Sequence, residues 1–238
     1  MSSVPELKES LRRRDTAVGD GNGSARGVAA LLHSFAEGRS KPKPKEQEVL
    51  DVATDYFLAH GYQGASINAM ARSSGISKES IYRYFSSKKQ LFEAVIGREL
   101  AEYQAGVRSA LSAEKTMDLR EALINIAETV LEVATTDRTL ALRRLIFDEA
   151  RRSPDVGQHY FKIGPEYAFA AVEEIFRSHH AESEFDPAIL SRHFLALVAY
   201  RPILERECAL GPAQSRAQIR ARVESIVADL MKAFLKSK

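Results

Sequence analysis

The chain has 238 residues, of which 45% are hydrophobic, so it is long enough to bury one large core or two smaller ones. Charged residues interrupt the apolar stretches, and no run approaches the roughly 18 apolar residues that a membrane-spanning helix needs. The arginines at 12–14 precede no apolar run, which argues against a secretory signal, and the single cysteine cannot form an internal disulfide. We therefore expect a soluble protein of the reducing cytoplasm, with no membrane partner.

The net charge of +2 is unevenly distributed along the chain. Residues 1–45 carry nine basic and five acidic side chains, whereas residues 46–65 carry four acidic side chains and no basic one. Residues 66–92 carry five basic side chains and one acidic, and the remaining residues sum to −2. A basic patch is more often a solvated face than a binding surface. The structural motif that contains the patch therefore decides between these two interpretations.

The first 45 residues are predicted to form a flexible basic arm. They combine charged residues with Gly, Ser and Pro, as in 19–24 and 41–45, a composition typical of mobile segments. An amphipathic turn around 28–35 is compatible with this prediction.

From Glu46 onward, apolar residues recur at helical spacing without strand-like alternation, which predicts an all-α fold. Gly61 stands where a left-handed residue would end the first helix. Ser66, Ser77 and Ser87 are expected N-caps of the next three helices, and Ser87 with Gln90 has the spacing of a capping box. The helices expected in this part are 46–60, 66–73, 77–85, and one from 87 to beyond 100.

Five further helices are expected, which makes nine in all. Asp137, Asp155, Asp186 and Ser215 are candidate N-caps for four of them. The pairs Gly164-Pro165 and Arg201-Pro202 each remove an internal hydrogen bond and are expected to kink or break a helix. The predicted ranges are 117–135, 138–152, 155–181, 187–209 and 215–236.

Two short helices joined by a glycine turn are characteristic of a helix-turn-helix. The motif needs a small residue in its first helix, glycine at the turn and an apolar residue in the second helix, and Ala71, Gly75 and Ile81 occupy these places. Many helical hairpins share this spacing, so an ordinary helical corner remains an alternative at this point.

The outer face of the second helix favours a nucleic-acid contact. If Ile81 faces inward, helical geometry turns four side chains outward. A merely solubilising face seldom includes a tyrosine, whereas a face of long donors suits the major groove of DNA. Tyr84 fits this face and the core equally well. The four outward residues are Lys78, Glu79, Tyr82 and Arg83.

Lys88 and Lys89 open the next helix, where the helix dipole favours anions and stability alone would select an acidic residue. A phosphate bound there would be held by the free amides and the two lysines together. The alternative is that both lysines are simply hydrated. Ser66 offers a second hydroxyl and amide pair for a phosphate, although most N-cap serines only cap.

Residues 46–92 resemble the DNA-binding domain of TetR-family regulators without a gap. The resemblance is carried by Gly61-Tyr62-Gln63-Gly64-Ala65-Ser66-Ile67, by Ala71 and Gly75-Ile76-Ser77-Lys78, and by the run from Ile81 to Phe92. It implies that 77–85 enters the major groove and that Tyr82 and Lys88 contact phosphates. Arg83 and Tyr84 replace a common Tyr-His pair, which leaves their direct contacts open. The resemblance and the residue pattern together predict a DNA-binding set of Ser66, Ser77, Lys78, Glu79, Tyr82, Arg83, Lys88 and Lys89.

The resemblance implies a three-helix DNA-binding head and a larger helical domain, 93–238, for ligand binding and dimerisation. The segment 142–165 looks like the C-terminal domain of AefR-type repressors. The last two helices would form a four-helix dimer interface, although their apolar stripes also suit the monomer core. These stripes comprise Ile189, Phe194, Leu197, Val198, Ile219, Val223, Ile226, Val227 and Leu230.

We therefore predict a homodimeric repressor that binds a near-palindromic operator and is released by a small effector held among helices 100–181. The four histidines of the C-terminal half lack the i, i+4 spacing of a helical metal site, and no nucleophile or phosphate-loop motif is present. No metal, cofactor or enzyme activity is expected. The alternative hypothesis is a helical interaction or ligand-binding module that keeps the motif for structural reasons; it would show no salt-sensitive retention on DNA.

Overall fold

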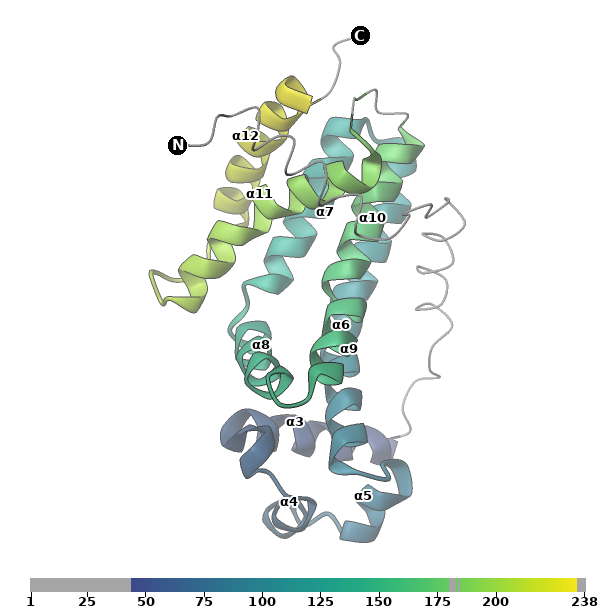
Figure 1. Ribbon diagram of the computed structural model, residues 1–238, viewed down its shortest axis with the longest axis vertical. Coiled ribbons are helices and arrows are strands. Elements are labelled where there is room, and N and C mark those ends of the chain that lie inside the picture. Colours follow the sequence, from purple (N-terminus) through teal and green to yellow (C-terminus); the bar gives the residue numbers. More distant parts are fainter. Residues whose placement is uncertain (1–43, 180–182, 184, 235–238) are drawn as a thin grey trace, which may run out of the picture.

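The computed structural model describes residues 44–179, 183 and 185–234, and within these ranges it contains helices and no strands (Figure 1). All but the last two residues of the predicted arm lie outside the described residues. None of the described helices is long and apolar enough to span a bilayer. In chain order the elements are α3 (Pro44–Gly64), α4 (Ile67–Ser74), α5 (Lys78–Tyr84), α6 (Lys88–Ala113), the 3₁₀ turn η1 (Glu114–Thr116), α7 (Leu119–Ala134), α8 (Asp137–Ala150), α9 (Pro154–Ile163), α10 (Pro165–Ser178), α11 (Pro187–Glu207) and α12 (Arg216–Phe234).

The all-α prediction is confirmed, with ten α-helices in the described residues instead of nine. The additional helix arises because the predicted 155–181 segment is divided at Gly164, and Pro165 then occupies the first turn of α10. The expected break at this pair is therefore confirmed. The other expected interruption is not a break, because α11 continues through Pro202.

Side-chain caps fix most of the helix starts. Ser66, Ser77 and Ser87 each accept a backbone amide in the first turn of α4, α5 and α6, as predicted. The reciprocal bond to Gln90 comes from the amide of Ser86, one residue before the position that the capping box predicts. Gly61 has the expected positive φ of 71°, although α3 resumes after it for one more turn.

The predictions for the later caps were right for two helices and wrong for two. Asp186 caps α11, and the hydroxyl of Ser215 accepts the amide of Gln218 at the start of α12. The cap of α8 is Thr136 rather than Asp137, since the threonine hydroxyl accepts an amide one residue earlier. Asp155 lies inside α9, because Pro154 already takes its first position.

α6 connects two apolar cores. Its first half closes the core of α3, α4 and α5, which lies at the lower end of Figure 1, and its second half packs in a helical body with α7, α10, α11 and α12. In the lower core, Phe57, Tyr62 and Phe92 form an aromatic cluster with ring centroids 4.8 to 5.9 Å apart. We call α3–α5 the head.

The head core is not closed by residues 46–92 alone. Buried side chains of α8 and α9 belong to the same cluster, including Leu142, Ile146, Val156 and Tyr160. This corner places the C-terminal region directly against the head, and a division at residue 92 stays a prediction of the sequence.

Candidate nucleic-acid interface

A sharp corner joins α4 to α5. Gly75 adopts a left-handed conformation with φ 74° and ψ 1°, which any side chain would make costly. Met70 of α4 and Ile81 of α5 are fully buried on its inner side, whereas Ala71 is only partly buried. The corner is therefore held by apolar packing, and its outer side is free to meet a partner.

The outer side of α5 presents the predicted polar cluster. Lys78, Glu79, Tyr82 and Arg83 are all exposed, and the Tyr82 side chain leaves 45% of its surface open to solvent. The ammonium of Lys78 lies 5.6 Å from the centre of the Tyr82 ring, so these two side chains share one surface. Tyr84 is instead partly buried against the head core, which decides between the two alternatives for this residue.

The two N-cap serines lie at the edges of this surface. Ser66 and Ser77 are exposed, and each hydroxyl accepts a backbone amide at 3.1 Å. The Ser77 hydroxyl also lies 2.9 Å from that of Ser80. Both serines therefore act as helix caps.

Lys88 is engaged inside the head. Its Nζ donates to the carbonyl oxygens of Tyr62 at 2.9 Å and Ala65 at 3.1 Å, and it lies 4.3 Å from the centre of the Tyr62 ring. An ammonium has three donors, so these two hydrogen bonds use two of them. Lys88 therefore joins the start of α6 to the carbonyls at and just after the end of α3. The sequence pattern predicts a phosphate contact or hydration for this lysine, and does not reveal this structural role.

Lys89 pairs with α9 instead of standing free. Its ammonium forms an ion pair with Asp155 of α9 and lies 4.0 Å from Glu93. The hydrogen bond between Lys89 and Asp155 raises the pKa of Lys89 and lowers that of Asp155. Because both side chains are about half exposed, water screens the pair and it contributes little to stability. Its main effect is to link the start of α6 with α9.

A second polar contact joins head and body. The amide of Gln63 donates to Oε2 of Glu149 in α8 at 2.7 Å, and the hydroxyl of Ser153 donates to Oε1 at 2.6 Å. Glu149 is only 2% exposed, so its carboxylate depends on these donors. Sequence analysis missed this contact because its partners lie 86 residues apart.

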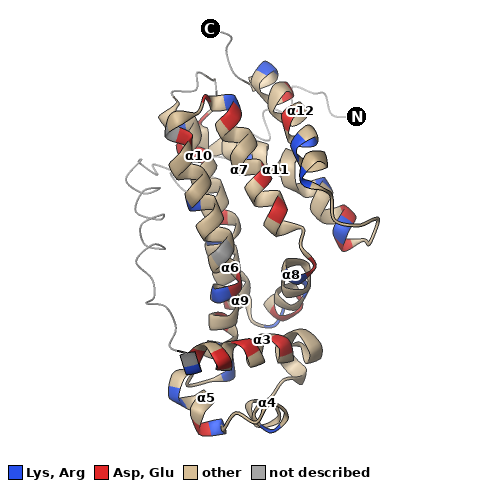
Figure 2. Ribbon diagram, turned by 180° about the vertical axis from the view of Figure 1, so that it is seen from behind, with Lys and Arg blue, Asp and Glu red and all other residues tan. Residues whose placement is uncertain are grey.

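Charge is arranged in keeping with the sequence pattern. Figure 2 shows basic segments along α4, α5 and the start of α6, at the end of the molecule opposite α12, and acidic segments along α3. The basic side chains of this end include Arg72, which is exposed at the end of α4 and was not among the predicted contacts. Within the described residues, no three His, Cys, Asp or Glu side chains are grouped to hold a metal ion.

Two family models match the chain. Residues 49–95 match the model for bacterial regulatory proteins of the tetR family, and residues 121–235 match the model for the C-terminal domain of AefR-like transcriptional repressors. The chain belongs to the TetR family. The second match confirms the resemblance of the C-terminal region to AefR-type repressors, and the protein is therefore a helix-turn-helix transcriptional regulator of the DNA-binding kind.

Relatives of this TetR-family regulator agree in fold and class. The HTH-type transcriptional repressor Rv1474c of Mycobacterium tuberculosis is 28% identical over 156 residues, which span 65% of this chain and 78% of the relative. A TetR-family regulator from Mesorhizobium loti superposes with a TM-score of 0.69 at 22% identity, over 83% of this chain and all of that one. The flavonoid-responsive regulator FrrA superposes with a TM-score of 0.67 at 26% identity, over 82% of this chain and 98% of its own.

Proposed function

We propose that this regulator is a ligand-responsive repressor that binds a near-palindromic operator as a homodimer and leaves it when a small effector binds. The observation that carries the proposal is the outer face of α5. Its exposed lysine, glutamate, tyrosine and arginine lie on one short helix, held against the head by Ile81. Such a helix fits the major groove, with its N-terminal residues nearest the bases.

Within this face we assign two kinds of contact. Lys78 and Glu79 would read base edges, with Arg83 beside them, because long donors and acceptors discriminate bases in the major groove. Tyr82, Ser66 and Ser77 would contact phosphates from the rim of the corner. Lys88 and Lys89 would add positive charge near the backbone while keeping their contacts within the protein.

The proposed dimer uses the exposed side of α11. Ile189, Leu197, Tyr200 and Leu204 follow helical spacing and are 39 to 70% exposed, which is unusual for large apolar side chains on one face. The remaining stripe residues are buried in the monomer core, except for Ile226, which is partly buried. The apolar residues of α11 and α12 therefore divide into two groups. The buried ones belong to the monomer core, and we assign the four exposed side chains of α11 to the dimer interface.

The α12 helix suits the same interface. Its exposed positions include Ala217, Ala221 and Ala228, whose small side chains let a partner helix approach closely. In such a dimer each α5 would occupy one half-site, with centres about 34 to 36 Å or somewhat further apart.

Effector release would pass through two connections. α6 links head and body covalently. The corner between α8 and α9 contacts α3 of the head through Glu149 and the start of α6 through Asp155. An effector that prefers a different packing of the body would shift both connections and so the spacing of the two heads. The relative FrrA is described as flavonoid-responsive, which supports a small-molecule signal for this chain as well.

Selection of bound fragments from genomic DNA tests the proposal most directly. We expect recovery of a sequence with two related half-sites, and fluorescence anisotropy should show binding that weakens linearly in log affinity against log salt. Absence of any salt-sensitive retention on DNA or heparin would favour the alternative, a helical interaction module.

A further inference from the structure

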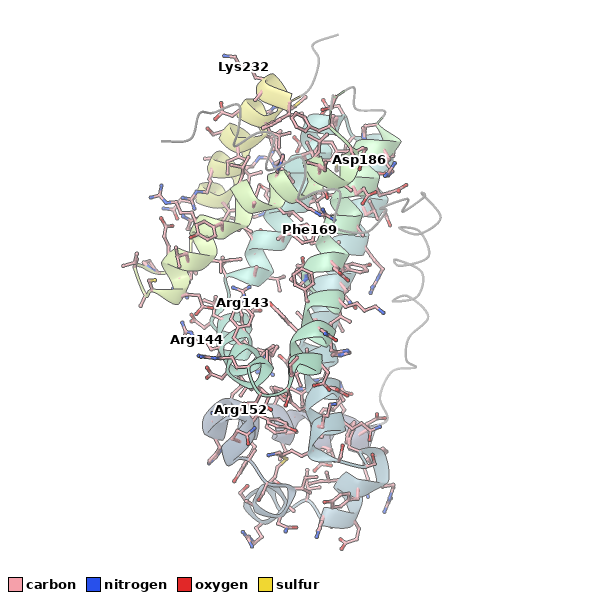
Figure 3. The ribbon with its side chains drawn as sticks, in the orientation of Figure 1. Arg143, Arg144, Arg152, Phe169, Asp186 and Lys232 are labelled. Carbon is pink, nitrogen blue, oxygen red and sulfur yellow. The ribbon has the colours of Figure 1, made fainter. Side chains whose placement is uncertain are left out.

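Arg143 is a buried arginine whose hydrogen bonding is incomplete. Its side chain is 10% exposed, and Figure 3 shows it leaving α8 near the helices of the body, apart from its neighbour Arg144. Nε donates to the hydroxyl of Tyr160 at 3.3 Å and Nη2 to the carbonyl of Ala134 at 3.4 Å, both long, while Nη1 has no hydrogen-bond partner. A guanidinium carries five N–H donors, so this group is ready to bind an anion.

One buried phenol, Tyr160, contacts this guanidinium at the junction of the two cores. Tyr160 belongs to the core of the head, whereas Tyr103 and Tyr167 belong to that of the body. Burial, followed by the nearby phenols, raises the pKa of Tyr103, and Arg143 opposes this rise. The Tyr103 hydroxyl is therefore protonated at neutral pH.

The charge around Arg143 is not balanced. Oε1 of Glu207 lies 3.8 Å from Nη1 of Arg143, beyond hydrogen-bond distance, while Oε2 accepts Nε of Arg144 at 2.6 Å. In the described part of the chain, one carboxylate thus serves two arginines. Because Glu207 is hydrogen-bonded to the exposed Arg144, the buried Arg143 has no hydrogen-bonded carboxylate of its own, and a monoanion would supply one.

We propose that Arg143, assisted by the hydroxyl of Tyr160, binds the carboxylate of a small monocarboxylic acid that is the effector. This assignment rests on the proposed ligand-responsive function and adds the chemical class of the ligand. A guanidinium binds a carboxylate through two parallel hydrogen bonds, which a neutral amide cannot reproduce. The apolar part of the acid would lie among the core side chains that adjoin Tyr160.

The position of Arg143 connects the ligand to the head. Arg143 and Glu149 lie on the same helix, α8, and Glu149 accepts the hydrogen bond of Gln63 in α3. A carboxylate that draws Arg143 away from the carbonyl of Ala134 and from Glu207 would shift α8 against α7 and α11. The shift would reach the head through Glu149.

Isothermal titration with matched probes tests the assignment, since the chain has no tryptophan to report binding. The probes are octanoate, decanoate, benzoate and cinnamate, each compared with its neutral primary amide, on the full-length chain. We expect at least one acid to bind wild-type protein about 10- to 100-fold more tightly than its amide, and Arg143→Met to abolish this preference. Arg152→Met, which removes an exposed guanidinium that does not contact Glu207, is the matched control and should keep the preference.

Two further measurements separate the possible outcomes. Circular dichroism should show that Arg143→Met is folded, so that loss of the preference reports the missing carboxylate contact and not unfolding. Acids that bind no better than amides, or a preference that survives in Arg143→Met, would overturn the assignment. DNA binding in the absence of acid is measured separately. If the protein does not bind DNA, the proposed function is contradicted, whereas the titration still tests whether Arg143 binds a carboxylate.

Discussion

Replacing Lys88 with methionine distinguishes a structural lysine from a phosphate contact. The substitution keeps most of the apolar stem and removes two charge-assisted hydrogen bonds to the carbonyls of Tyr62 and Ala65. Such bonds contribute about 1.5 to 3 kcal/mol each when buried. Because Lys88 is only part-buried, water replaces some of that energy, and about 1 kcal/mol each is the appropriate estimate.

Lys88→Met should therefore lower the free energy of unfolding by about 2 kcal/mol, which corresponds to a melting temperature about 4 to 8 °C lower for a chain of this size. Circular dichroism at 222 nm follows the unfolding of the helices. Lys89→Met is the matched control, since its exposed pair with Asp155 contributes little and its melting temperature should be nearly that of wild type. A salt series of operator binding on both variants measures how many DNA phosphates each variant still neutralises.

The result that would refute this reasoning is a Lys88→Met protein as stable as wild type. If the salt slope of that variant also fell by about one, Lys88 would be a phosphate ligand first and its carbonyl hydrogen bonds incidental.

Four other outcomes follow from the structure and the sequence. Tyr82→Phe should weaken binding to operator and random DNA by the same factor, as compared by anisotropy, whereas Glu79→Gln should change the bases recovered by fragment selection; equal effects on both DNAs from Glu79→Gln would show that it does not read bases. Leu197→Glu should yield a folded monomer by light scattering with operator affinity lower by at least about 100-fold, and an unchanged dimer would place the interface elsewhere. Burial favours the neutral form of Glu99, but the hydrogen bonds from Arg138 and Arg98 outweigh this effect and lower the pKa of Glu99. Glu99 thus stabilises the fold above its ordinary pKa of 4.5 and loses that contribution as the pH falls below it, so Glu99→Gln should be less stable than wild type at pH 7 and approach it at pH 3; a pH-independent difference would contradict this. The basic residues of the arm, among them the arginines at 12–14, are expected to add salt-dependent phosphate contacts. Deleting residues 1–43 should then lower the salt slope of DNA binding, and an identical slope would exclude such contacts.

Local chemistry made much of the fold predictable. The serine caps, the left-handed Gly61 and Gly75, and the break at Gly164-Pro165 each act within one helical turn, so the sequence pattern was sufficient to place them. Helix propensity and apolar spacing then predicted the class of fold, because strand-like alternation is absent from the part of the chain that follows Glu46.

Contacts between distant segments could not be predicted in the same way. The partners of Lys88 lie 23 and 26 residues earlier in the chain, and that of Lys89 lies on α9. A lysine at a helix start has the same local pattern whether it meets a phosphate, a carbonyl or a carboxylate. The burial of Arg143 was hidden for a related reason, since Arg144 beside it is exposed and nothing in the sequence separates the two.

The core shared by the head with α8 and α9 limits how such regulators can be recombined. A graft that exchanged only residues 46–92 would strip the partner surface from Leu142, Ile146 and Val156 and leave both pieces with exposed apolar area. A functional chimera must therefore exchange the α8–α9 corner together with the head, or match it residue by residue. The head of this protein can therefore be transferred only together with the α8–α9 corner, as a unit that is discontinuous in sequence.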